Sequence, residues 1–144
     1  MDVAALQKKL QIAKLYLGNV AQTLADFLRS DAAPVGFVSI DLDYYSSTKD
    51  ALKIFDGPDD KFLPRVTCYL DDIVNDGIRF PCSYVGEQLA IEEFNQRAEP
   101  QHKLCPWGIW DHQLLFPAVW NQQMYVYHRF SHPQYTAYNI GPDR

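Results

Sequence analysis

The sequence has little cysteine, no excess of positive charge and no long apolar run, and each shortage excludes a class of protein. Its three cysteines, Cys68, Cys82 and Cys105, are odd in number and lack a CxxC spacing, which argues against a disulfide framework and a zinc site. The chain has 13 basic against 18 acidic residues, so neither a nucleic-acid binder nor a polybasic membrane anchor is indicated. No apolar run approaches the roughly 20 residues that a membrane helix needs.

Several enzyme motifs are also missing. The sequence has no G-x-S-x-G elbow, no P-loop and no H-E-x-x-H pair, which argues against the hydrolases, kinases and metalloproteases that use them. It contains seven glycines but no G-x-G, the pattern of the loops that hold nucleotide cofactors after a first strand. His112, the histidine best placed to contact a substrate from a loop, is more simply a surface residue.

What the chain does contain is enough apolar material for one folded domain. Its 144 residues are 47% hydrophobic and 14% aromatic, which excludes intrinsic disorder and predicts a single domain over residues 1–144. The first residues carry an acid at position 2 and two lysines, so they predict an amphipathic helix and not a signal peptide. We therefore expect a cytoplasmic protein.

Strand and helix patterns alternate through the first two-thirds of the chain. Helices are predicted at about 2–11, from Val20 to near Ser30, from an N-cap at Ser47 with Asp50 as its capping-box partner, and over Gly86–Gln96. Strands are predicted at Ala13–Leu17, Val35–Ile40, Val66–Leu70, Leu104–Trp110 and Gln123–His128.

This alternation predicts an α/β fold with a mostly parallel sheet and flanking helices. The near-continuous apolar run Val35–Ile40 is typical of a strand buried on both faces. The last two predicted strands are expected to form an antiparallel pair at an edge of the sheet. In open sheets of this kind, ligands bind beyond the carboxyl ends of the strands, so those ends are the places to look for a site.

Pairs of acids follow two of these strands. Asp41 and Asp43 come after Ile40, and Asp71 and Asp72 come after Leu70. If the two strands are neighbours, four carboxylates gather at one rim and repel each other unless a cation neutralises them. Mg²⁺, Mn²⁺ or Ca²⁺ would do so, because hard cations prefer oxygen ligands. Acids after strands also cap helices and turns, but two pairs at successive strand ends favour a metal or catalytic site.

Three motifs in the same order resemble one enzyme family. The stretch VSIDLDYYSSTKDAL at 38–52 resembles the I-D-x-D-x-Y-x-S-T-x-x-A-L motif of class I S-adenosylmethionine-dependent methyltransferases of the macrocin O-methyltransferase type. CYLDD at 68–72 is similar to that family's next strand, and GNVAQTL at 18–24 is similar to its preceding G-x-x-x-x-T-L element. The resemblance covers residues 13 to 73.

This resemblance implies a Rossmann-like, methyltransferase-type fold and methyl transfer to a hydroxyl of a small molecule, in the family often a sugar or natural product. It implies that Asp41, Asp71 and Asp72 bind Mg²⁺ and that Asp43 is the general base on the acceptor hydroxyl. Asn19 would lie near the adenosine of S-adenosylmethionine, although a turn residue is the simpler interpretation.

The sequence also departs from the family. The stretch DGPDDKFLPR at 56–65 replaces a Pro-Gly-Gly turn, and Ile73 stands where the family usually has tyrosine. Since no G-x-G precedes the motifs, the sheet is expected to lack its N-terminal cofactor-binding strands. Ala13–Leu17 would then pair with Val35–Ile40 or with a partner chain, or leave a hydrophobic edge exposed. A homo-oligomer formed through that edge, or through the aromatic C-terminal third, is one expected consequence.

Two other functions remain open. A phosphatase or phosphotransferase of the haloacid-dehalogenase type also uses D-x-D and a later D-D, but here Tyr44 and Tyr45 follow where that family has Gly-Thr. A truncated or degenerate, non-catalytic domain that binds a partner is the third hypothesis. The aromatic residues of the last third would either line an acceptor pocket or, more simply, pack in the core and in an interface; they are Trp107, Trp110, Phe116, Trp120, Tyr125 and Tyr127.

Overall fold

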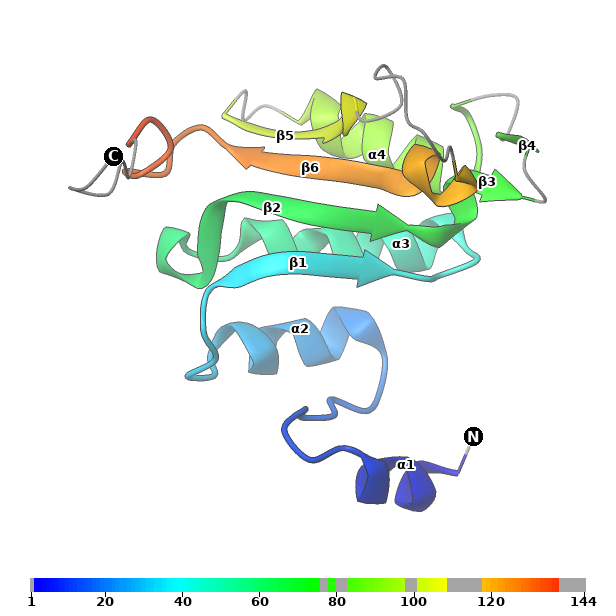
Figure 1. Ribbon diagram of the computed structural model, residues 1–144, viewed down its shortest axis with the longest axis vertical. Coiled ribbons are helices and arrows are strands. Elements are labelled where there is room, and N and C mark those ends of the chain that lie inside the picture. The colour runs from blue at the N-terminus through cyan, green and yellow to red at the C-terminus, as the bar shows by residue number, and fades with distance from the viewer. Residues whose placement is uncertain (1, 76–77, 80–82, 98–100, 109–117, 138–144) are drawn as a thin grey trace.

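The computed structural model describes residues 2–75, 78–79, 83–97, 101–108 and 118–137, and these form an α/β fold around one four-stranded mixed sheet (Figure 1). The strands lie in the order β1 (Val35–Ile40), β2 (Phe62–Leu70), β6 (Met124–Arg129) and β5 (His102–Pro106). Two further short strands, β3 (Val74–Asn75) and β4 (Ile78–Arg79), pair with each other.

The sheet is less parallel than the sequence predicts. β1 and β2 are parallel, and β6 is antiparallel to β2 and to β5. Three of the four strands therefore run in the same direction, but the reversed strand β6 lies between two of them. Only the β1–β2 pair is parallel as a result. The predicted antiparallel pair of the last two strands is confirmed, since β6 and β5 pair at one side of the sheet with β5 outermost.

The helices follow the predicted positions with one correction. They are α1 (Val3–Lys9), α2 (Val20–Leu28), α3 (Tyr45–Ala51) and α4 (Gly86–Gln96), with short 3₁₀ turns η1 (Leu52–Asp56), η2 (Asp59–Lys61), η3 (Asp71–Ile73) and η5 (Val119–Gln123). The predicted N-cap at Ser47 is wrong, because α3 begins at Tyr45 with no side-chain cap. Thr48 stabilises this start instead, since its hydroxyl lies 3.2 Å from each of two acceptors, the Leu42 and Tyr44 carbonyls.

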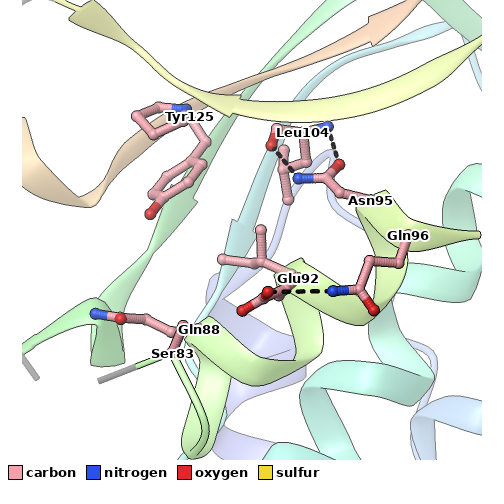
Figure 2. A pocket seen from close by; sticks show the side chains of 9 residues that line it. Ser83, Gln88, Glu92, Asn95, Gln96, Leu104 and Tyr125 are labelled. Atoms are coloured by element: carbon pink, nitrogen blue, oxygen red, sulfur yellow. Dashed lines mark hydrogen bonds between the residues drawn. The ribbon is translucent and has the colours of Figure 1, made fainter. Parts of the chain in front are cut away.

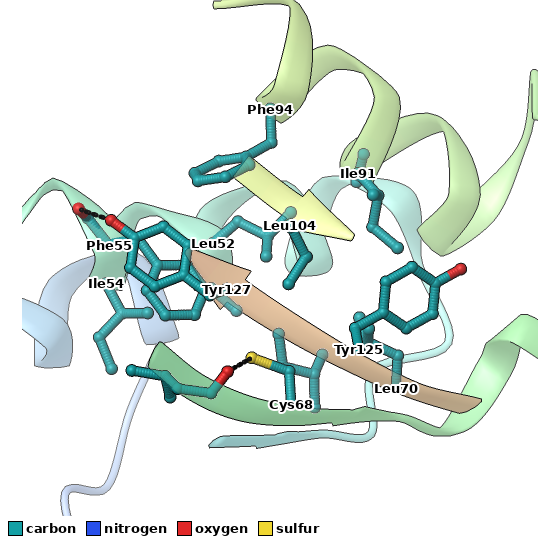
Figure 3. Packing of buried hydrophobic residues seen from close by; sticks show 14 of the residues in the cluster. Leu52, Ile54, Phe55, Cys68, Leu70, Ile91, Phe94, Leu104, Tyr125 and Tyr127 are labelled. Carbon is teal, nitrogen blue, oxygen red and sulfur yellow. Dashed lines mark hydrogen bonds between the residues drawn. The ribbon is translucent and has the colours of Figure 1, made fainter. Parts of the chain in front are cut away.

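The core lies between one face of the sheet and the helices (Figure 3). Along β2, every second side chain from Val66 to Leu70 is buried, and this face meets residues of α3, η1 and α4. The ring of Tyr127 on β6 stacks on Phe55 with centroids 3.9 Å apart, and Phe94 of α4 contacts both rings edge-on. Burying each such side chain stabilises the fold by about 2 kcal/mol.

The strand β1 is not buried on both faces. Its neighbour on one side is β2, and no described strand pairs with its other side. Phe37 is 57% exposed and Ser39 is also exposed, while Ile40 faces the core. The apolar run therefore belongs to an edge strand with one covered face, because the helices pack toward the core face of the sheet.

The predicted strand at Ala13–Leu17 is also wrong. These residues have no regular secondary structure and pair with none of the described strands. The Tyr16 ring packs edge-on against Phe27 of α2, with centroids 6.0 Å apart, and the Lys14 ammonium lies over the Tyr16 ring. Alternation of apolar and polar residues favours a strand only where a neighbouring strand supplies hydrogen bonds, and here the aromatic contact with α2 decides the conformation instead.

None of the described helices is both long and apolar enough to span a lipid bilayer.

Candidate functional site

The carboxyl ends of β1 and β2 meet at one edge of the sheet, as their sequence order predicts. Ile40 and Leu70, the last residues of these strands, are register partners. Asp41 and Asp43 lie in the turn that follows β1, while Asp71 and Asp72 open the 3₁₀ turn η3 directly after β2. Parallel neighbours thus bring acids 30 positions apart to the same rim of the fold.

Three of the four predicted acids gather closely enough to share a cation. Asp41, Asp43 and Asp72 each offer one carboxylate oxygen, and these oxygens lie within 4.8 Å of one another. We call these three residues the acidic cluster. Asp41 and Asp43 are exposed and Asp72 is half-buried. Within the described residues, the ion pairs formed by lysine and arginine do not include any of the three.

The electrostatics of the cluster are those of unneutralised like charges. The pKa of Asp72 is raised, first because burial disfavours the charged form and then because Asp43, Asp71 and Asp41 carry charge of the same sign. One oxygen of this side chain, Oδ2, is buried and has no hydrogen-bond partner among the described residues. A buried carboxylate oxygen without a partner is costly, and a cation would offset that cost.

The carboxylate of Asp71 is not part of the acidic cluster and is bound by Tyr69. Its Oδ1 accepts a hydrogen bond of 2.5 Å from the Tyr69 hydroxyl, which also lies 3.2 Å from Gln123 Oε1. The Gln123 amide donates to the Asp71 carbonyl, so this residue is tied to the segment leading into β6 by two routes. The hydrogen bond to Asp71 and burial raise the pKa of Tyr69 to about 12.

A fifth acid, Glu87, lies beside the cluster and was not singled out from the sequence. It stands in the first turn of α4, is 2% exposed, and its Oε2 accepts a hydrogen bond of 3.0 Å from the Asp72 backbone N–H. Burial, followed by the charge of Asp72, raises its pKa to about 8. Its other oxygen, Oε1, is buried without a partner among the described residues.

The sequence feature that could have identified Glu87 as a buried acid is its position on the helix. It falls at spacings of three, four and seven residues from Ala90, Ile91 and Phe94, which are the other buried residues of α4. A carboxylate on the apolar face of an amphipathic helix is unusual, and its position on that face predicts that it is buried. The helical pattern does not predict the hydrogen-bond partner of Glu87, because Asp72 lies 15 positions earlier in the chain.

Two hollows lie near Asp41 on the side of β1 that faces α2. The first, of about 350 Å³, is mostly apolar and is lined by Val20, Leu24, Val38, Ser39, Ile40, Asp41, Leu42, Ala51 and Ile54. The second, of about 340 Å³, is more polar and is lined by Gly18, Asn19, Val20, Leu42, Ser46, Ser47 and Asp50. Asn19, the predicted cofactor contact, lines the second hollow while its Oδ1 caps α2 by accepting from the Ala21 N–H.

A third hollow, of about 330 Å³, lies between α4 and strands β5 and β6 (Figure 2). Ile91, Leu104, Pro106 and Tyr125 form its apolar wall, and Ser83, Gln88, Glu92, Asn95 and Gln96 supply polar groups. Hydrogen bonds engage several of these polar side chains: Gln96 donates to Glu92 at 3.1 Å, and the Asn95 amide bonds both backbone groups of Leu104 at 2.8 Å.

The aromatic residues of the last third divide between core and surface. Tyr125 and Tyr127 are buried in the core, in agreement with the packing interpretation. Trp107 and Trp120 are exposed, at 40% and 51%. Trp110, His112 and Phe116 lie outside the described residues.

Comparisons with protein-family models, with curated protein sequences and with solved structures found no match to this chain. The functional interpretation therefore depends on the motifs and on the geometry of the site.

Proposed function

We propose that this protein is an S-adenosylmethionine-dependent O-methyltransferase-like protein with a Rossmann-like fold, which binds a divalent cation and acts on a hydroxyl of a small molecule. The observation that carries this proposal is the acidic cluster. Its oxygens lie within 4.8 Å of one another, at the edge of a β-α-β unit where ligands of α/β proteins bind. The motif resemblance at residues 18–24, 38–52 and 68–72 supplies the reaction type.

The residues of the site fit a hard divalent cation. All of the donors are carboxylate oxygens, the ligands that Mg²⁺, Mn²⁺ and Ca²⁺ prefer, and Asp72 Oδ2 is a buried acceptor without a partner in the described part of the chain. Asp41 and Asp72 would hold the ion. Asp71 remains a predicted ligand, but its carboxylate would first have to leave the Tyr69 hydroxyl. A bound Mg²⁺ would hold an acceptor hydroxyl and lower its pKa.

Asp43 is the residue best placed to receive the proton of that hydroxyl. It is exposed and belongs to the acidic cluster, so a solvent-accessible substrate can reach it. General-base catalysis by a positioned carboxylate of this kind is typically worth about 10²–10⁴-fold in rate.

The fit to S-adenosylmethionine is partial. The polar hollow at Asn19 and the apolar hollow at Asp41 share Val20 and Leu42 in their walls, so a ligand with an apolar and a polar part would find both near the carboxyl end of β1. The sequence has no G-x-G, the loop pattern whose backbone N–H groups hold such cofactors. The residues present therefore supply a cation site and a base, but not the glycine loop of a cofactor site.

Titration calorimetry with MgCl₂, followed by S-adenosylmethionine on the Mg²⁺-loaded protein, tests the two halves of the proposal separately. We expect heat with Mg²⁺, and its loss in Asp72→Asn, because that substitution removes a ligand charge. Asp60→Asn is the matched control, since Asp60 is an exposed acid in η2, which precedes β2. Absence of Mg²⁺ heat would overturn the cation site. Heat with Mg²⁺ but none with S-adenosylmethionine would overturn only the methyltransferase activity of this chain.

The same three carboxylates would also serve phosphoryl transfer from a phosphate ester. In such a reaction one aspartate of the D-x-D pair attacks phosphorus and displaces the alcohol, which takes up a proton, and water then hydrolyses the aspartyl phosphate to release inorganic phosphate; a bound cation would neutralise the phosphate charge. The cluster has no lysine or arginine ion pair among the described residues, which disfavours binding of a phosphate dianion without a cation. Mg²⁺-dependent phosphatase turnover that disappears in Asp41→Asn would favour this second function over the first.

A further inference from the structure

Glu87 stands out as a buried acid that neither the motifs nor the proposed catalytic roles include. Burying a carboxyl group beside three aspartates works against folding, and an apolar residue of similar volume would fit the core at lower cost. Local rules of this kind are broken mainly where a residue serves a site. Because Glu87 contacts η3, which carries Asp72, we relate its burial to the acidic cluster.

Its contacts connect α4 to the cluster in two ways. Oε2 accepts the Asp72 backbone N–H at 3.0 Å, so Glu87 fixes the turn that carries the Asp72 side chain. Oε1 of Glu87 and Oδ2 of Asp72 are both buried without partners among the described residues. Asp72 itself belongs to the acidic cluster with Asp41 and Asp43, so Glu87 contacts the cluster through Asp72 and each of the two side chains keeps one buried oxygen without a described partner.

We propose that Glu87 is a positioning residue of the cation site: it holds Asp72 toward Asp41 and Asp43 and adds a buried carboxylate behind the three cluster residues. This inference rests on the proposed binding of a cation by the acidic cluster. It goes beyond that proposal because it adds a residue from α4, outside the matched motifs, to the determinants of affinity. Residues that orient ligands from behind a metal site typically affect affinity by about 10–100-fold.

The test compares Glu87→Gln with Glu92→Gln. The first substitution keeps the size of the side chain and an oxygen that accepts the Asp72 N–H, but removes the carboxylate. Glu92 is on the same helix and carries the same charge, but it is only half-buried and bonds Gln96. We expect Mg²⁺ and Ca²⁺ binding, measured by calorimetry, to weaken about 10-fold or more in Glu87→Gln and to stay unchanged in Glu92→Gln. Terbium luminescence sensitised by nearby tyrosines gives a second measure of the same site.

A second readout separates positioning from general support of the fold. In the absence of cation, Glu87→Gln is expected to unfold at the same temperature as the wild type or higher, because it relieves a buried acid next to like charges. Weaker binding together with a lower unfolding temperature would mean a merely structural role and would overturn the inference.

The other possible outcomes also support or overturn the proposed role of Glu87. Unchanged cation affinity in Glu87→Gln, in a wild-type protein that does bind, would overturn the role of Glu87 alone. A wild-type protein that binds no cation would overturn the proposed site and the role of Glu87 with it. If Glu87→Gln does not fold, Glu87→Asp takes its place: it keeps the charge on a shorter side chain, so reduced affinity supports positioning and wild-type affinity contradicts it.

Discussion

Asp72 and Glu87 show how strongly a residue's chemistry depends on its surroundings. Both are ordinary acids in the sequence, yet the backbone N–H of one bonds the carboxylate of the other and each keeps a buried oxygen without a described partner. Asp41 and Asp43, two residues apart, stay exposed. The acidic cluster therefore has a side exposed to solvent and a buried side formed by the protein.

The raised pKa of Glu87 predicts a pH dependence of stability in the cation-free protein. Its folded-state pKa of about 8 lies above the ordinary value of 4.5, so the folded state binds the proton more tightly than the unfolded state. This contribution to stability is complete below about 4.5 and is lost as pH rises toward 8, with a limiting slope of about 1.4 kcal/mol per pH unit.

Urea unfolding at several pH values between about 5 and 8 measures this slope. Glu87→Gln is expected to flatten the decline, because it removes the titrating group and leaves the other acids in place. Equal slopes in the two proteins would show that Glu87 does not keep its proton on folding.

At the scale of single elements, the start of α3 controls the turn that carries Asp41 and Asp43. Thr48 is fully buried, and its hydroxyl lies within hydrogen-bond distance of the Leu42 and Tyr44 carbonyls on either side of Asp43. Thr48→Val keeps the shape of the side chain and removes the donor. We expect a loss of about 1–2 kcal/mol in the free energy of unfolding, together with weaker Mg²⁺ binding.

Ser47→Ala is the matched control for that change, because the helix does not use Ser47 as its cap. Its expected effect on the free energy of unfolding is below about 0.5 kcal/mol. A loss near about 1 kcal/mol in Ser47→Ala would instead restore the N-cap that the sequence predicts.

The two edge strands of the sheet differ in how they are protected. On β5, the Asn95 amide bonds the backbone N–H and carbonyl of Leu104, and Pro106 has no N–H to offer, so strand addition is blocked there. On β1, the six residues contain no charge and no proline, and Phe37 is 57% exposed. The edge formed by β1 is therefore the more open one.

Self-association through β1 stays a prediction. Sedimentation velocity at rising concentration is expected to show a dimer that Phe37→Lys weakens, because a lysine opposes edge pairing. Trp120→Lys tests the aromatic alternative at an exposed residue outside the sheet. A monomer at all concentrations would contradict both routes.

At the scale of the whole molecule, the described helices α2, α3 and α4 supply the core on one face of the sheet. Phe37, Thr67 and Val126 are register partners on the opposite face, and none of them is fully buried. The sequence-based expectation of a strand buried on both faces assumed covering layers on both sides. The described part of the chain provides the layer on one side only.

Much of the local structure could be predicted because it depends on neighbours in the chain. The spacing of apolar residues gave α4 its bounds and placed α1 and α2, and short apolar runs located β1 and the second half of β2. The meeting of acids after Ile40 and Leu70 followed from the rule that parallel neighbours end at the same edge. Periodicity and strand order are properties that a sequence carries by itself.

Only the tertiary structure decided the properties that depend on distant partners. It showed that Ala13–Leu17 has no described strand to pair with, that β6 inserts between β2 and β5, and that the Asp71 carboxylate turns to Tyr69. It also joined Glu87 to Asp72. Hydrogen-bond partners and burial are set by contacts between segments that are far apart in the chain. The sequence by itself therefore identified the four aspartates that follow β1 and β2. Packing determined which acids form the exposed cluster and which acid, Glu87, is buried beside it.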